Sequence, residues 1–253
     1  MLKRAATKDA REGSPRDNLL LRALPDAEYA RLLPDLEPID MALGSVLYEP
    51  GSLLRHIYFP TSSIVSLLYV MNDGASAEIA VVGKDGLVGM SLYLGGGTTP
   101  SRAVVQNAGL AYRLKAPAFM TEFHRYGELH QLLLRYTQAL VTQMVQTAVC
   151  NRHHAIDQQF CRWLLLSLDR LPSNVLTMTH ELIANMLGSS VAEVVTLADK
   201  LQNLQLLTHK GGQIRVIDRP GVEKKSCECY RVVKTETDRL LPQKEIRSTA
   251  RTA

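Results

Sequence analysis

Histidine, cysteine and acidic side chains occur at two places where their spacing invites comparison with a metal site. His153 and His154 precede Asp157, a set that can bind a metal ion or supply a catalytic base, but we identify no third ligand nearby. We therefore interpret this set as a cluster on a helix surface. Cys227 and Cys229 lack zinc-ligand spacing and a second pair, so we interpret them as small core or surface thiols and predict no bound metal.

Catalytic motifs are incomplete in this chain. His180 and Glu181 match the beginning of a zinc-protease motif, but Ala184 occupies the position of the second histidine. The glycines at 95–97 lack the lysine and the hydroxyl residue of a phosphate-binding loop, so they are interpreted as a flexible turn. Because no nucleophile is paired with a base in a recognisable pattern, we predict that the protein is not an enzyme.

Polar residues within 178–207 have a different potential use, which is contact with a nucleic-acid duplex. The stretch predicts two short helices joined by a tight turn at Gly188, since glycine suits the left-handed conformation that ends a helix. Thr177 or Thr179 can cap the first helix, and Ser189 or Ser190 the second. The residues expected to face inward are Leu182, Ile183, Met186, Leu187, Val194, Leu197, Ala198 and Leu201. Such a helix-turn-helix occurs in DNA-binding proteins and also as a plain corner in protein cores.

The segment that follows favours the DNA-binding alternative. Residues 206–208 and 213–217 are strand-like, and Gly211-Gly212 between them suits a hairpin turn. His209 and Lys210 make the tip of this hairpin basic. A helix-turn-helix followed directly by a basic-tipped hairpin is typical of a winged helix.

Composition limits the compartment and the partners. The 253 residues allow one large or two ordinary domains, and 46% of them are hydrophobic, which is enough for sizeable cores. No apolar run reaches the roughly 18 residues that a membrane span needs, so no membrane partner is expected. The first 20 residues are charged and lack an apolar signal region, and the four cysteines fit a reducing compartment. We therefore expect a cytoplasmic protein.

The positive charge is unevenly distributed. Residues 1–150 hold 14 basic and 14 acidic side chains, whereas residues 151–253 hold 15 basic and 11 acidic ones. The whole excess of +4 therefore falls in the C-terminal part, where a phosphate-binding surface would use it. A solvated basic face is the alternative interpretation.

The elements that must position these residues begin with a β-rich region. Residues 1–17 are polar and charged and are predicted to be disordered, and 18–33 favour one or two short helices. Strand-like runs separated by Gly, Pro and Asn turns then predict an antiparallel sandwich or barrel. These runs are 46–48, 56–59, 64–71, 76–82, 102–106 and 110–114, with the clearest hairpin turn at 72–74.

Three helical segments flank the helix-turn-helix. Residues 116–152 are predicted to be helical, with a broad apolar stripe that can pack on the β-region and on a twin helix. We favour a dimer helix over a purely internal one. The residues assigned to the dimer helix are Leu129, Leu133, Tyr136, Leu140 and Met144. Residues 151–171 and 222–241 are the other two helices, the second of them charged and amphipathic.

Several strings, taken in order, resemble the family of the cyclic-AMP receptor protein and the fumarate–nitrate regulator, and in particular a bacterial subgroup of it. The strings are LYEPG (47–51), YFP (58–60), EIAVVG (78–83), GLVG (86–89), RAVV (102–105), CRWLL (161–165), ELIANMLG (181–188) and CECY (227–230). The resemblance covers roughly residues 18–242. Its strength is the joint order of a β-roll, a long helix and a winged helix-turn-helix.

The resemblance implies an α+β chain with three structured parts. These are an antiparallel β-roll sensor domain of the cyclic-nucleotide-binding, jelly-roll type (18–115), a dimerisation helix (116–150) and a winged helix-turn-helix (151–242). Polar composition adds a disordered tail before them (1–17) and a loose tail after them (243–253). The resemblance also implies a homodimeric transcription regulator whose sensor domain controls DNA binding. The implied partners are double-stranded DNA, a second copy of the chain, RNA polymerase and an unidentified small-molecule effector.

The predicted ligand site departs from the family's pattern. Cyclic-nucleotide binders of this family use a glycine–glutamate pair for the ribose and an arginine before serine or threonine for the phosphate. Here the corresponding loop contains Gly86, Val88 and Gly89 without a carboxylate, and Arg102 precedes Ala103 one place later than the pattern. We therefore expect no cyclic-nucleotide cofactor. Phosphate binding through Arg102 is the alternative.

An iron–sulfur cofactor is not expected either. The oxygen-sensing members of the family hold their cluster near the N-terminus, and no cysteine precedes Cys150 in this chain.

The predicted reading helix also departs from the pattern. In the related subgroup, two arginines stand at the positions of Ser190 and Val191 and a glutamate at Ala192, so bidentate arginine–guanine contacts are missing here. The only basic residue in 190–203 is Lys200, against Glu193 and Asp199. The remaining candidate DNA-binding residues are Thr179, His180, Ser189, Ser190, Val191, Thr196, Lys200, Lys210 and Arg215. Either polar, apolar and shape contacts supply specificity, or the chain is a sensor or partner-binding protein that reads DNA poorly.

Overall fold

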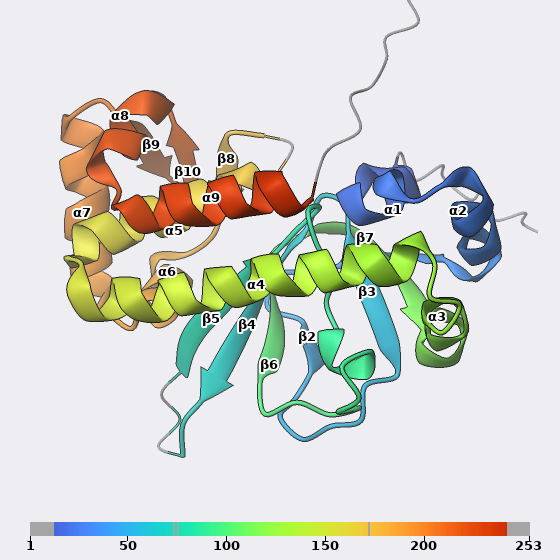
Figure 1. Ribbon diagram of the computed structural model, residues 1–253. Helices are drawn as coiled ribbons and strands as arrows, with labels where there is room; N and C mark the ends of the chain where they lie inside the picture. The colour runs from blue at the N-terminus through green and yellow to red at the C-terminus, as the bar shows by residue number, and fades with distance from the viewer. Residues whose placement is uncertain (1–12, 73, 75, 172, 242–253) are drawn as a thin grey trace, which may run out of the picture.

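The computed structural model describes residues 13–72, 74, 76–171 and 173–241 (Figure 1). The expected loose tail at 243–253 and most of the expected disordered tail at 1–17 lie outside the described residues. The end of that N-terminal tail has regular structure, because Pro15–Asp17 forms a 3-10 helix (η1) whose first amides are capped by Ser14. Three short helical segments follow, namely α1 (Leu19–Ala23), α2 (Asp26–Leu32) and η2 (Leu33–Asp35).

The β-rich region folds as two antiparallel sheets facing each other, as the alternation of strands and turns predicts. One sheet has the order β1-β7-β3 and the other β2-β6-β4-β5. The strands are β1 (Glu37–Met41), β2 (Val46–Tyr48), β3 (His56–Pro60), β4 (Ile64–Val70), β5 (Ser76–Val82), β6 (Arg102–Asn107) and β7 (Gly109–Lys115). The turn predicted at 72–74 includes Asp73, which lies outside the described residues, but the flanking strands pair from Val70↔Ser76 onward.

The segment predicted as one helix over 116–152 is two helices. These are α3 (Ala116–Phe123) and α4 (Glu128–His153). The break has a tertiary cause, because the Glu28 carboxylate accepts hydrogen bonds from the backbone N–H groups of Glu128 and Leu129, at 2.9 Å each. Gly127 permits this approach, since a Cβ there would lie 2.6 Å from Glu28 Oε1.

The C-terminal part is a three-stranded sheet surrounded by helices. Its elements are α5 (Ile156–Asp169), β8 (Val175–Thr177), α6 (His180–Leu187), α7 (Val191–Asn203), β9 (Leu207–Lys210), β10 (Gln213–Val216), α8 (Arg219–Lys225) and α9 (Glu228–Leu240). The sheet order is β8-β10-β9. The helix predicted over 222–241 is interrupted between α8 and α9, where Cys227 occupies the N-cap of α9.

The β-roll and the C-terminal part share a hydrophobic core. Ile64, Leu68, Val81 and Val104 of the sheet β2-β6-β4-β5 belong to the same buried cluster as α5 and the helix-turn-helix. The chain also returns on itself, because α9 lies alongside α4 (Figure 1). Among the described residues no single helix is long and apolar enough to span a bilayer; α6 and α7 meet that test only as a pair bent by 106°.

Candidate nucleic-acid interface and ligand pocket

The helix-turn-helix is formed by the capping residues that the sequence indicates. Thr179 Oγ1 accepts a hydrogen bond from the backbone N–H of Leu182 (3.3 Å), and Gly188 adopts a left-handed φ of 63° at the end of α6. Ser190 and Glu193 then form a reciprocal capping box at the start of α7. The 106° bend between the two helices is within the range of helix-turn-helix motifs.

The packing of the two helices agrees with the predicted inward face. All four inward residues of α7 are buried, whereas Leu182 and Leu187 of α6 are only partly buried. The fully buried members of the predicted set are Ile183, Met186, Val194, Leu197, Ala198 and Leu201.

The predicted hairpin is present and has a third strand. β9 and β10 pair antiparallel from Gln213↔Lys210 to Val216↔Leu207, and both turn glycines have positive φ. β8, which the sequence reading did not identify, adds to the other edge of β10. The backbone N–H of Met178 donates to Gly212 O at 2.7 Å, which joins the tip of the hairpin to the start of α6.

Seven of the nine candidate DNA-binding residues fall into two groups in the structure. Thr179 and His180 lie beside the hairpin, where the His180 ring is 5.4 Å from the ring of His209. Lys210 and Arg215 are exposed on the same hairpin, and no ion pair joins them to another residue within the described ranges. Ser189, Ser190 and Val191 form the second group, at the far end of α6 and the start of α7.

The exposed face of α7 offers no free positive charge. Lys200 Nζ lies 3.3 Å from Asp157 Oδ2 on α5, so this lysine is already paired. Asp199 Oδ1 lies 2.9 Å from Nε2 of His209, a contact that the sequence did not indicate because the two residues are ten positions apart. Thr196 is exposed, but its hydroxyl donates to Ala192 O at 2.8 Å.

The predicted ligand loop is filled by the chain's own side chains. A Cβ at Gly86 would lie 2.6 Å from the Tyr136 ring, and the Tyr136 hydroxyl donates to Leu87 O at 2.7 Å. Val88 is buried and pairs with Tyr58 of β3 through two backbone hydrogen bonds. Gly89 has a φ of 113° and sits against the backbone of β3. These contacts occupy the space on the Cβ side of Gly86.

Arg102 pairs with Glu49, a residue that lines a different hollow. Its Nε lies 3.1 Å from Oε2 of Glu49, and both side chains are partly exposed. Glu49 also lines an open pocket of about 450 Å³ between β2 and β3. Ala103 is fully buried, so it offers no surface for a ligand. The contacts among the described residues do not connect Arg102 with the Gly86–Gly89 loop.

The stripe assigned to the dimer helix points into the chain itself, which corrects that assignment. Four of its members are at most 4% exposed and pack in the core of the β-roll, and the fifth is partly buried there; they are Leu129, Leu133, Tyr136, Leu140 and Met144. The exposed apolar residues of α4 are instead Leu134, Val141, Val145 and Val149. The sequence spacing shows that both stripes exist, but only the fold decides which one is covered.

A buried polar network lies where the β-roll meets α5. The Ser66 hydroxyl lies 2.6 Å from Glu78 Oε2 and 2.7 Å from Gln106 Oε1, and Gln106 Nε2 donates to Ser167 Oγ on α5. One hydroxyl hydrogen cannot serve both acceptors, so a protonated Glu78 that donates to Ser66 satisfies the network. Burial raises the pKa of Glu78 to about 7, despite the opposing hydrogen bond from Ser66.

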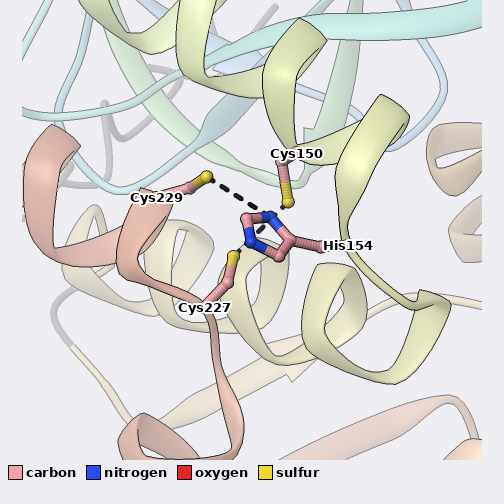
Figure 2. Close-up of side chains that lie close together, drawn as sticks. All are labelled: Cys150, His154, Cys227 and Cys229. Atoms are coloured by element: carbon pink, nitrogen blue, oxygen red, sulfur yellow. Dashed lines mark hydrogen bonds between the residues drawn. The ribbon is translucent and has the colours of Figure 1, made fainter.

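Ligand-type side chains that the sequence analysis treated separately converge in the structure. Cys150, His154, Cys227 and Cys229 place one sulfur or ring nitrogen each within 4.8 Å of one another (Figure 2). The expectation that the histidine pair has no third ligand nearby is therefore wrong. Asp157 is not part of this group, because it pairs with Lys200.

The thiols of this group interact directly. Cys150 and Cys227 have their sulfurs 3.5 Å apart, and the hydrogen bond between them favours a thiolate on Cys227. This contact and the backbone N–H of Cys229 lower the pKa of Cys227 to about 5, against the opposing effect of burial. All four cysteines of the chain are free thiols.

Two family models match the chain. The model of the cyclic nucleotide-binding domain matches residues 39–126, and the model of the Crp-like helix-turn-helix domain matches residues 158–225. Neither describes an enzyme. No curated protein matches the chain by sequence.

Solved structures share the arrangement along most of the chain. FixK2 from Bradyrhizobium japonicum aligns with a TM-score of 0.63 at 13% identity, over 76% of this chain and 98% of that one. A transcriptional regulator of the CRP family from Thermus thermophilus aligns with a TM-score of 0.61 at 17% identity, over 74% and 96%. The c-di-GMP responsive regulator CLP from Xanthomonas campestris aligns with a TM-score of 0.57 at 16% identity, over 76% and 99%. At these identities the likeness is one of fold.

Proposed function

The chain belongs to the Crp/Fnr type, and from this premise we propose that it is a dimeric transcriptional regulator whose β-roll controls DNA binding by the winged helix-turn-helix. The observation that carries the proposal is the complete winged helix-turn-helix, that is α6, α7 and the β9–β10 hairpin, which we call the reading module. A capped α7 stands at 106° to α6, and beside it the hairpin presents Lys210 and Arg215 with no ion-pair partner among the described residues. Unpaired basic side chains next to an exposed helix suit the phosphates that flank a major groove.

Phosphate contacts account for most of the proposed affinity. Lys210 and Arg215 contact the sugar–phosphate backbone of the DNA, and Thr179 and His180 at the start of α6 add further contacts to it. Base edges meet Ser190, Val191 and Thr196, which offer hydroxyl and apolar contacts but no bidentate arginine. Specificity therefore depends on weaker contacts and on the shape of the duplex.

A second copy of the chain is the proposed partner of α4. The exposed residues Leu134, Val141, Val145 and Val149 follow spacings of seven, four and four, so they form one stripe along the helix. Such a stripe is complementary to itself across a two-fold axis. We expect Val141→Asp to convert the dimer to a monomer in sedimentation velocity, because it places a charge at the centre of the seam. Unchanged sedimentation of this variant would contradict the proposed seam.

Control of the reading module by the β-roll is supported by their shared core. Val81 and Val104 of the roll pack in one cluster with Trp163 and Leu164 of α5, so a displacement of the sheet acts directly on the helix that precedes the helix-turn-helix. We propose that a small-molecule effector causes this displacement. RNA polymerase is a further proposed partner of the DNA-bound dimer.

The second candidate function is a signal-sensing or partner-binding protein with weak DNA reading. The pairing of Lys200 with Asp157 favours it, because the one lysine of the exposed α7 face already has an acidic partner. The two candidates differ in genome-wide occupancy: sharp palindromic sites support the regulator, whereas diffuse occupancy supports the second candidate.

Fluorescence anisotropy on the gene's own promoter region tests the first proposal directly. We expect the logarithm of the binding constant to fall linearly with the logarithm of the salt concentration, since phosphate contacts release counterions. A binding constant that does not change with salt would contradict phosphate-driven binding by the hairpin.

A further inference from the structure

We propose that Cys150, His154, Cys227 and Cys229 form a structural zinc site that fastens the end of α4 to the start of α9. The four side chains come from two ends of helices and point toward one centre (Figure 2). All four lie outside the segments matched by the two family models, which end at residue 126, begin again at 158 and end at 225. The site therefore lies at the end of α4 and the start of α9, outside both matched segments.

Helix geometry brings each pair of ligands to the centre. Cys150 and His154 are four residues apart at the end of α4, so they lie on one face of the last turn. Cys227 is the N-cap of α9, and Cys229 follows in its first turn. The interruption between α8 and α9 is what allows both of these thiols to turn toward α4.

The distances fit a single tetrahedral ion. With Zn–S bonds of about 2.3 Å and Zn–N bonds of about 2.0 Å, two sulfurs lie about 3.8 Å apart, and a sulfur and a nitrogen about 3.5 Å apart. In the structure the sulfurs of Cys150 and Cys227 are 3.5 Å apart, and Cys229 Sγ is 3.6 Å from His154 Nδ1. Such spacing is too short for a four-iron cluster, in which each cysteine binds a different iron atom.

The donor set and the surroundings select zinc as the ion. Three thiolates and one imidazole form a closed four-ligand shell, which is the arrangement of structural zinc sites. The three cysteines are at most 5% exposed. The thiols share one small hydrophobic cluster of their own, apart from the two large cores.

A carboxylate supports the histidine from outside the shell. Oε2 of Glu228 lies 3.3 Å from Nε2 of His154, the ring nitrogen opposite to the one that faces Cys229. Histidines that bind zinc donate their second N–H to a carboxylate or carbonyl, which fixes the tautomer and orients the ring. This contact is independent of the four ligands and points to the same function of His154.

The proposed ion would hold a junction between the two halves of the chain. His154 is the C-cap of α4, one residue before the turn into α5, and α9 is the last helix of the C-terminal part. Metal–ligand bonds at this point would link α9, and with it the reading module, to α4, the helix that carries the proposed dimer stripe. Because the four ligands come together only in the folded chain, binding of the ion contributes to the stability of this junction.

Metal content of the full-length chain tests the site independently of DNA binding. The protein is purified without nickel resin or chelator from cells grown with zinc, and its metals are counted by mass spectrometry. We expect about one zinc per chain, loss of the zinc in Cys150→Ser and Cys227→Ser, and full retention in Cys161→Ser. Cys161 is the matched control, since it is equally buried but outside the cluster.

Two further measurements apply if the cysteine variants fail to fold. Cobalt bound to the wild-type chain should give the thiolate-to-metal absorption and the intense visible bands of a tetrahedral thiolate site. Glu228→Gln keeps all four ligands and should weaken zinc binding about 10- to 100-fold in chelator competition. Purified chain without zinc and with Cys150 joined to Cys227 as a disulfide would overturn the proposal, as would equal loss of zinc in Cys161→Ser.

Discussion

The hairpin of the winged module and the Gly86–Gly89 loop of the β-roll are both positions at which this fold can bind a ligand, yet their states are opposite. The hairpin leaves Lys210 and Arg215 exposed, with no ion pair to the rest of the described chain. The loop is closed by Tyr136, which fills the space at Gly86 and hydrogen-bonds to Leu87 O. One fold thus carries an open site and a filled one, so function has to be argued from each site.

Removing the Tyr136 side chain tests whether it holds the Gly86–Gly89 loop closed. Tyr136→Ala deletes a buried aromatic side chain and leaves the Leu87 carbonyl without its hydroxyl donor, so we expect the free energy of unfolding in urea to fall by about 3–5 kcal/mol. Tyr126→Ala is the matched control, because Tyr126 is 70% exposed, and we expect a loss below about 1 kcal/mol there. Equal losses in the two variants would show that Tyr136 does not hold the loop closed.

The next largest effect is a pH dependence of stability, and it comes from Glu78, which is buried where the β-roll meets α5. The pKa of Glu78 is about 7 in the folded chain, against 4.5 as the ordinary value. Between these values the folded chain holds a proton that the unfolded chain has released, so stability falls as pH rises through this window, by about 3 kcal/mol at most. Glu78→Gln should remove this slope, which urea unfolding at pH 5 and pH 8 measures.

The control for this slope is a partly exposed glutamate whose pKa is shifted in the opposite direction. The Arg239 side chain lowers the pKa of Glu236, so Glu236 is ionised in both states from pH 5 to pH 8. Glu236→Gln should therefore keep the wild-type slope. If Glu78→Gln also keeps it, Glu78 does not carry the buried proton.

Substitutions in the exposed hairpin should have a smaller effect, a loss of roughly tenfold in affinity for DNA. Lys210→Ala or Arg215→Ala removes one phosphate contact per chain, hence two per dimer, and the slope of log affinity against log salt should decrease by about 2. Anisotropy titrations at several salt concentrations measure both quantities. Arg113→Ala, in β7 and paired with Glu37, serves as the control; a slope unaffected by the hairpin variants would contradict their contact with DNA.

The smallest expected effect is none at all. Because the loop is filled and Arg102 is already paired with Glu49, cyclic nucleotides should release no binding heat in titration calorimetry with the wild-type chain, even at millimolar ligand. A saturable signal that disappears in Arg102→Ala would show that the β-roll binds a nucleotide through this arginine. That result would also reverse the contrast between the two sites.

Local signals were sufficient where the determinants lie close together in the sequence. Gly188, the serines at 189–190 and Gly211-Gly212 set the turn, the cap and the hairpin within a few residues. The structure has both turns as predicted and takes Ser190 rather than Ser189 as the cap. The antiparallel β-region followed from the same kind of evidence, because its turns separate short strands of suitable composition.

Determinants that lie far apart in the sequence escaped prediction. The break before α4 depends on Glu28, a hundred residues away from the amides it caps. The covered face of α4 depends on where the β-roll packs, which a periodic stripe does not specify. Cys150 and Cys227 are 77 positions apart, and their spacing alone resembles no metal motif. For the candidate DNA-binding residues, the sequence identified the exposed hairpin but not the pairing of Lys200 with Asp157.

The buried cluster that runs from Ile64 and Val104 through Trp163 to the helix-turn-helix has a practical consequence for anyone who wishes to cut this chain in two. A fragment beginning after α4 would expose the apolar side of α5 to water and would tend to aggregate. The intact chain should in turn melt as one cooperative unit, with a single calorimetric peak for both halves. Large rotations of one half against the other are therefore disfavoured. Signals should pass between the halves through shifts small enough to keep the shared hydrophobic cluster closed to water.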